Sequence, residues 1–148
     1  MFVWKEHDSP FDFKYLKFLF YATEHMKEHM LNSIQDTTDT TDTDGMTEIR
    51  QAFLTGERAE FFARKRRYVD TVFADGESPL KHACDIELVE SSFKWKYPLW
   101  YCRNVVARDC TWFEMGRAGV WYTDHIVVED STIEAPKNFR RCHDVVLR

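Results

Sequence analysis

Three stretches of the chain repeat one pattern. Residues 86–93 read IELVESSF, residues 105–112 read VVARDCTW and residues 126–133 read IVVEDSTI. They begin 19 and 21 residues apart, and each has apolar residues at its first, third and eighth positions. A small Ser or Cys stands at the sixth position of all three, directly after an acidic residue. Self-similarity at a nearly fixed period indicates a repeat architecture.

The same pattern extends outward through residues 46–148. The segment FLTGE at 53–57 returns as FADGE at 73–77, and Val145 opens a further unit. Two apolar columns result from aligning the units, and we expect both to be buried. The first contains Phe53, Phe73, Phe93, Trp112 and Ile133, and the second contains Leu80, Leu99, Val120 and Phe139.

A period near 20 fits two architectures, the leucine-rich repeat and the parallel β-helix. The leucine-rich pattern Leu-x-x-Leu-x-Leu with its Asn is absent, whereas the units are rich in β-branched residues with period-2 alternation. About 20 residues suit three short strands, and stacking at ~4.8 Å lets each strand pair with its copies above and below. The sequence therefore predicts a mainly β fold, a single-stranded parallel β-helix of about five coils of 19–21 residues.

Two polar columns mark the corners of the predicted coils. Asp85, Asn104, His125 and Asp144 each stand just before an apolar opening residue, where we expect a left-handed turn. Asp70, Glu90, Asp109 and Asp130 form an acidic column. Like charges ~5 Å apart repel each other, so we expect this column to be solvated.

The first 45 residues differ from the rest, with nine acidic and four basic residues. Residues 1–35 are predicted to be a helical extension, with the helix over 13–34, and 36–45 a disordered Asp/Thr linker. Either Met46 is the natural start, or the helix caps the end of the β-helix. The chain stops at Arg148 within a sixth coil, and we expect it to be the N-terminal part of a longer protein.

Composition excludes several classes of function. The net charge of −5 argues against a nucleic-acid or anionic-membrane binder, and no apolar run reaches the ~18 residues of a membrane span. The four cysteines lack zinc-site spacing and there is no secretion signal, so we expect a cytoplasmic protein with reduced, mostly buried thiols. We expect neither a metal nor a cofactor, and the oligomeric state stays open.

The repeat region resembles a family of uncharacterised, mainly bacterial, right-handed parallel β-helix proteins with a pectin-lyase-like fold. The resemblance covers residues 46–148 and implies the fold and its handedness, but no established reaction. The matching segments are TGERA at 55–59, DGESPLK at 75–81, FKWKYPLW at 93–100, EMGRA at 114–118, WY at 121–122 and APK at 135–137.

Two adjacent columns contain the residues best suited to bind a ligand. One is Lys81, Trp100, Trp121 and Arg140, and the next is His82, Tyr101, Tyr122 and Arg141. Cations flank the two Trp, which places the first column on the outer surface. Indoles with neighbouring cations suit sugars that carry carboxylates, so we name Trp100, Trp121, Tyr122, Lys137 and Arg140 as candidate binding residues. The alternative is structural packing, with Lys81 and Arg140 covering the indole faces.

Glu77, Lys81, Glu114 and Arg117 are the candidate catalytic residues. A Lys or Arg could act as the base in a lyase, and paired carboxylates could serve a glycoside hydrolase. A salt-bridged surface is the alternative, for instance Glu114 with Arg117. Two functions therefore stay open: a carbohydrate-active or carbohydrate-binding β-helix, acting on acidic oligo- or polysaccharides, and a non-catalytic scaffold or assembly protein.

Overall fold

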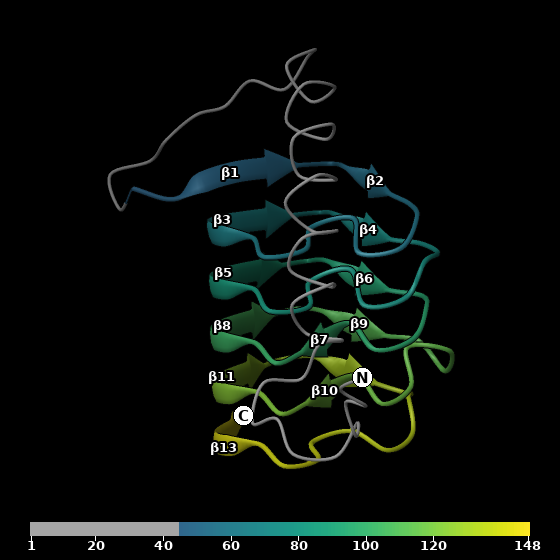
Figure 1. Cartoon of the computed structure of the whole chain (residues 1–148), viewed down its shortest axis with the longest axis vertical. Helices are drawn as coiled ribbons and strands as arrows, with labels where there is room; N and C mark the ends of the chain where they lie inside the picture. Colours follow the sequence, from purple (N-terminus) through teal and green to yellow (C-terminus); the bar gives the residue numbers. More distant parts are fainter. Residues whose placement is uncertain (1–44) are drawn as a thin grey trace, which may run out of the picture. The chain divides into compact units, whose positions relative to one another are not determined.

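The computed structural model describes residues 45–148, which form a stack of parallel β-coils (Figure 1). The predicted helix over 13–34 and the predicted linker, apart from Gly45, lie outside the described residues. Successive coils stack in chain order from β1 to β13, so each coil contacts only its neighbours. The predicted mainly β solenoid of about five coils is confirmed.

Three parallel sheets form the sides of the solenoid. The six-stranded sheet contains β1 (Thr47–Arg50), β3 (Arg64–Val69), β5 (Cys84–Val89), β8 (Arg103–Arg108), β11 (Asp124–Glu129) and β13 (His143–Leu147). The five-stranded sheet contains β2 (Phe53–Leu54), β4 (Val72–Phe73), β6 (Ser92–Phe93), β9 (Thr111–Trp112) and β12 (Thr132–Ile133). The two-stranded sheet contains β7 (Leu99–Trp100) and β10 (Val120–Trp121).

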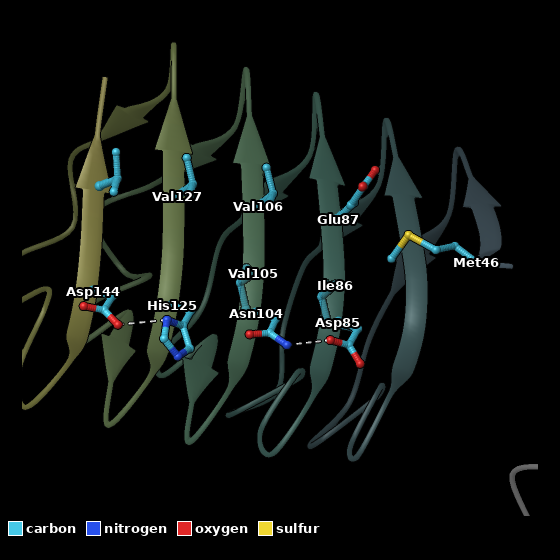
Figure 2. Close-up of a pocket in the computed structure, with 11 residues that line it drawn as sticks. Met46, Asp85, Ile86, Glu87, Asn104, Val105, Val106, His125, Val127 and Asp144 are labelled. Carbon is cyan, nitrogen blue, oxygen red and sulfur yellow. Dashed lines mark hydrogen bonds and ion pairs between the residues drawn. The ribbon is translucent and has the colours of Figure 1, made fainter. Parts of the chain in front are cut away.

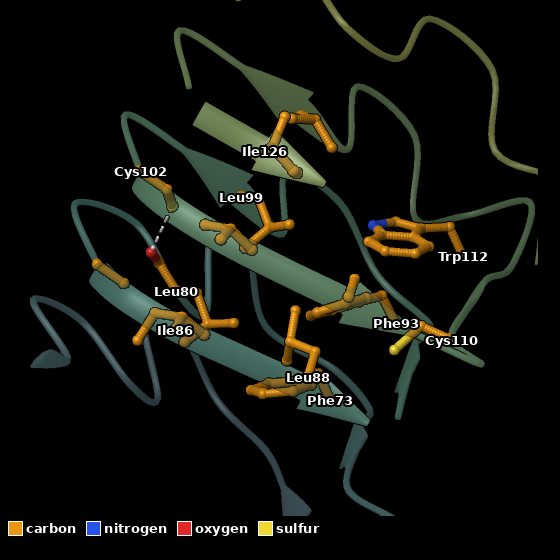
Figure 3. Packing of buried hydrophobic residues seen from close by; sticks show 14 of the residues in the cluster. Phe73, Leu80, Ile86, Leu88, Phe93, Leu99, Cys102, Cys110, Trp112 and Ile126 are labelled. Carbon is orange, nitrogen blue, oxygen red and sulfur yellow. Dashed lines mark hydrogen bonds between the residues drawn. The ribbon is translucent and has the colours of Figure 1, made fainter. Parts of the chain in front are cut away.

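The strand register places like residues over like. Ile86 pairs with Val105 and Val105 with Ile126, and all three side chains are buried. Phe93 lies between Phe73 and Trp112, with ring centroids 4.7 and 5.1 Å away (Figure 3). Such stacking removes whole side chains from water, worth ~1.5–3 kcal/mol for each large apolar residue. Most of the two predicted core columns is buried, whereas Ile133 and Phe139 are only partly buried.

A column of small polar side chains completes the hydrogen bonding at one corner. The hydroxyl groups of Thr71, Ser91 and Ser131 donate to the carbonyl two residues earlier in the chain. The same Ser hydroxyls accept bonds from the backbone amides of Thr71 and Cys110 in the preceding coil, at 3.2 and 3.0 Å. Buried amides at the bend thus find partners, which explains the Ser/Thr/Cys pattern.

Left-handed backbone conformations form the corners of the coils. Asp85, Asn104, His125 and Asp144 have φ between 50° and 58°, as predicted for the Asp/Asn/His column. The acidic column also has positive φ, and its four members Asp70, Glu90, Asp109 and Asp130 are exposed, as predicted. Positive φ is uncommon outside glycine, and Asn, Asp and His tolerate it best.

The placement of Phe53 differs from the prediction. Phe53 is 68% exposed and pairs with Val72, whereas Leu54 pairs with Phe73 and packs against the core. The repeated Phe-x-x-Gly-Glu segment suggests a spacing of 20, but the strand register between β2 and β4 is 19. Because side chains alternate along a strand, a shift of one residue turns Phe53 away from the interior.

The four cysteines are free, and three are buried while Cys142 is partly buried, as expected. The Cys102 thiol donates to the carbonyl of Leu80 in the preceding coil (Figure 3). The hydroxyl of Thr123, the equivalent residue of the next coil, donates in the same way to the carbonyl of Leu99. Burial raises the pKa of Cys102 to about 12 and that of Cys110 to about 11. Both thiols therefore remain protonated and serve the packing of the core.

Candidate functional site

Two adjacent ladders of side chains cover one side of the solenoid, and we call them together the aromatic face. The inner ladder contains Lys81, Trp100, Trp121 and Arg140, and the outer ladder contains Phe62, His82, Tyr101, Tyr122 and Arg141. Leu99 and Val120 point into the core, which turns the next residue of each strand outward. Tyr101 and Tyr122 follow with φ near 55°, and this bend keeps a second consecutive side chain outside the core.

The rings of each ladder stack face to face. The indoles of Trp100 and Trp121 lie 5.1 Å apart with 6° between their planes. Tyr101 and Tyr122 lie 4.7 Å apart at 3°. His82 extends the outer ladder, 5.1 Å from Tyr101. The strand spacing imposes this geometry, because identical residues in register lie ~4.8 Å apart. The structure therefore brings the predicted aromatic residues together in one surface.

Cations cap both ladders at the same end. The Arg140 guanidinium lies 4.9 Å from the centre of Trp121, and that of Arg141 lies 5.6 Å from Tyr122. Lys81 lies at the other end, 6.0 Å from Trp100. The indole of Trp100 is also flanked by Tyr97, whose ring centroid is 4.6 Å away. Both indoles thus have neighbours on their faces, so a sugar stacking on Trp121 must first displace Arg140.

The edges of the indoles are held by the backbone. The Nε1 atom of Trp100 donates to the carbonyl of Ala118, and that of Trp121 donates to the carbonyl of Lys137, both at 2.7 Å. Each indole is therefore fixed to the next coil and cannot rotate without losing a hydrogen bond. Lys137, a predicted binding residue, is exposed beside this contact.

The electrostatics of the aromatic face keep its imidazole neutral. Burial, together with the charges of the neighbouring cations Lys81, Arg64 and Arg58, lowers the pKa of His82 to about 4. Burial also lowers the pKa of Lys81, with a contribution from Arg58. A neutral His82 can stack between Phe62 and Tyr101 without bringing a further positive charge into this cluster.

The predicted catalytic residues occupy different surroundings. Glu77 forms an ion pair with Lys96 at 3.2 Å. Glu114 and Arg117 are exposed in the loop between β9 and β10, and neither forms an ion pair with another described residue. Lys81 lies within the aromatic face. In the described part of the chain, no hydrogen bond or ion pair links the side chains of Glu77, Glu114 and Arg117 to one another.

A second surface lies on the outer face of the six-stranded sheet and was missed by sequence reasoning. It is a groove of about 500 Å³ that crosses β5, β8, β11 and β13 (Figure 2). We call it the outer groove. One row of its lining is Asp85, Asn104, His125 and Asp144, and the parallel row is Glu87, Val106, Val127 and Val146.

The polar row of the outer groove consists of two contacting pairs. Asn104 donates to Asp85 at 2.7 Å, and His125 Nδ1 lies 2.9 Å from an Asp144 oxygen (Figure 2). The bond from Asn104 lowers the pKa of Asp85, and the charges of Arg103 and Lys65 act in the same direction. The Asp/Asn/His column was predicted only as a turn. The signal for a groove was the outward-facing Val106, Val127 and Val146, each two residues after a member of that column.

The described residues contain no group of three or more His, Cys, Asp or Glu arranged to hold a metal ion. In the same part of the chain, no helix has the length and apolar character needed to cross a membrane.

Comparison with known proteins places the chain in a family and goes no further. No curated protein and no solved structure matched it. A family described as "Protein of unknown function (DUF3737)" matches residues 47–148, the same segment that forms the solenoid. That match covers more than half of the chain, and the chain belongs to the DUF3737 family.

Proposed function

We propose that this solenoid binds acidic carbohydrate through the cationic end of its aromatic face. The observation that carries the proposal is the pair of exposed guanidinium groups of Arg140 and Arg141, each held over a stacked ring. Neither forms an ion pair with any described residue. Two adjacent cations with preset orientations are therefore available to an anionic ligand.

The chemistry of arginine favours a carboxylate or a similar anion at this position. A guanidinium that stacks on an aromatic ring keeps its N–H edge free, and this edge matches a carboxylate in a bidentate hydrogen bond. Each exposed pair contributes only ~0.2–1 kcal/mol, so one sugar unit would bind weakly. A polymer of uronic acid units can engage Arg140, Arg141 and the exposed Lys137 together, and linked contacts raise the overall affinity.

The surroundings of the indoles fit the packing alternative of the sequence analysis better than a platform on which a sugar stacks. Their faces contact other side chains, and their N–H groups bind the backbone. In this proposal, Trp121 and Tyr122 support the guanidiniums, and the ligand contacts the cations first. The arrangement supports binding better than catalysis, because no hydrogen bond or ion pair among the described residues brings the side chains of Glu77, Glu114 and Arg117 together.

A calorimetric comparison of two sugars tests the proposal. We expect the chain to bind oligogalacturonate and to bind a neutral cello-oligosaccharide of the same length more weakly. Replacing Arg140 and Arg141 together with Gln should weaken oligogalacturonate binding about three- to tenfold. Arg50→Gln removes the same kind of charge on β1 and serves as the control. Equal binding of both sugars, or an equal loss in the control, would contradict the proposal.

The scaffold function remains the second candidate, and the stacked rings favour it. Ladders of Trp and Tyr whose faces cover one another stabilise the coil stack whether or not a ligand binds. If neither sugar binds and Trp121→Ala lowers the melting temperature sharply, the aromatic face is a structural element and the scaffold function is the better account.

A further inference from the structure

The outer groove combines an apolar floor with negative charge. Among the described residues, its lining contains three carboxylates, Asp85, Glu87 and Asp144, and no lysine or arginine. Val106 and Val127 lie between the two ends, partly exposed, in the row that Glu87 begins (Figure 2). Glu87 is already paired with Arg67 at 2.7 Å. Asp85 at one end and Asp144 at the other form no ion pair with a described lysine or arginine, although Arg103 and Lys65 act on Asp85 from a greater distance.

The position of the groove restricts the class of ligand. It lies on the face of the sheet, where the backbone amides and carbonyls of β5, β8 and β11 already bond to neighbouring strands. An extended peptide that recognises a sheet through its backbone needs a free edge. Of the four strands under the groove, β13 alone lies at an end of the sheet, so a ligand over β5, β8 and β11 meets no such edge. A ligand here must be recognised by side chains alone: apolar contacts along the floor and charge at the ends.

The spacing of the two carboxylates can be stated from the strand register. Asp85, Asn104, His125 and Asp144 occupy equivalent corners of four successive coils. Three steps of ~4.8 Å place Asp85 and Asp144 on the order of 14 Å apart along the solenoid axis. Asn104 donates a hydrogen bond to Asp85, and His125 Nδ1 lies 2.9 Å from Asp144, but each carboxylate retains further acceptor positions.

We propose that the outer groove binds a linear aliphatic di- or polyamine, with its methylene chain over Val106 and Val127 and its ammonium groups at Asp85 and Asp144. Methylene groups gain free energy by leaving water against the valines, and each ammonium can donate to a carboxylate. An acidic sugar is disfavoured here because its carboxylates would face those of the groove. This site is independent of the proposed carbohydrate site and makes use of a different surface.

A length series of α,ω-diaminoalkanes tests this site. The full-length protein is titrated with each diamine by calorimetry. The affinity should increase with the length of the diamine up to the length at which the distance between its ammonium groups matches that between Asp85 and Asp144. A monoamine with the same number of carbons should bind about two- to fivefold more weakly, because it engages only one end. An affinity that does not depend on length, or a monoamine that binds equally well, would overturn the proposal.

Asparagine variants locate the binding. Asp85→Asn and Asp144→Asn keep the left-handed corner and an acceptor oxygen, and each should weaken the best diamine about two- to fivefold. Asp109→Asn is a matched control, since Asp109 is also exposed with φ 52° but lies outside the groove. An equal loss in all three variants would show only a general effect of net charge and would refute the site.

A second readout does not depend on these variants. Methyl resonances of Val106 and Val127 should shift on adding the diamine, whereas those of the buried Val105 should move much less. Methyl shifts absent at Val106 and Val127 but present elsewhere would place the amine on another surface and exclude the groove.

Discussion

Gly56 and Gly76 show how a single residue adapts to the stacking of coils. Both have left-handed backbone, with φ of 89° and 88°. A Cβ atom built on Gly56 meets no atom within 4 Å, but one built on Gly76 would overlap the backbone carbonyl of Gly56. The recurring Thr-Gly-Glu and Asp-Gly-Glu segments thus contain one glycine needed for its conformation alone and one also needed for close approach.

The two glycines give a matched pair of variants. Gly56→Ala should lower the free energy of unfolding by about 1–2 kcal/mol, because alanine is strained at this φ. Gly76→Ala should cost about 3 kcal/mol or more, because the overlap adds to the same strain. Urea denaturation of both variants measures the difference. Equal losses would mean that the coils do not approach each other as closely at this corner as described.

The ladders of the aromatic face are the elements that connect fold and site. Residue identity repeats from coil to coil, so strand register alone aligns Trp100 with Trp121 and Tyr101 with Tyr122. Replacing one ring removes contacts on both of its faces. His82 occupies a place in the outer ladder where the other members are aromatic or cationic, and its imidazole is neutral there.

The neutral imidazole predicts a dependence of stability on pH. His82 has a pKa of about 4 in the folded protein and ~6.5 when unfolded, so between these values the unfolded chain binds more protons. His82 should therefore destabilise the fold progressively as pH falls from ~6.5 to 4, by about 1–2 kcal/mol after allowing for its partial exposure. Above pH ~7 this contribution should be constant.

Denaturation midpoints at several pH values measure this effect. His82→Phe retains a ring between Phe62 and Tyr101 but cannot titrate, so its stability should change less between pH 6.5 and 4. If the variant and the natural chain lose the same stability over this interval, other groups cause the acid sensitivity, and His82 is not held neutral.

The sequence predicts some of these elements correctly and others not. The spacing of apolar and small residues predicts the parallel coils and both aromatic columns, because stacking requires like residues at equivalent positions. It does not predict that Leu54 rather than Phe53 enters the core. One coil differs from its neighbour by a single residue in length, and a repeated motif cannot reveal which residue absorbs that difference.

At the scale of the whole molecule, the solenoid presents two surfaces of opposite charge. The aromatic face carries exposed arginines, and the lining of the outer groove in residues 45–148 has carboxylates but no lysine or arginine. The sequence suggests the first surface because Trp, Tyr and cations recur in neighbouring columns. The groove exists because Val106 and Val127 face outward from the six-stranded sheet and because β5, β8, β11 and β13 together form a concave surface. The residue types in the repeated columns do not by themselves predict this concave shape.

The central claim is that the capped end of the aromatic face binds acidic carbohydrate, and indole N–H resonances can test it directly. The Trp121 indole N–H bonds to Lys137 beneath Arg140, whereas the Trp112 indole is fully buried and bonds to no described residue. In an NMR titration with oligogalacturonate, the Trp121 indole signal should shift and that of Trp112 should stay in place. A matched neutral oligosaccharide should move neither signal. Equal responses to both sugars, or no shift at Trp121 on saturation with the acidic one, would contradict the account.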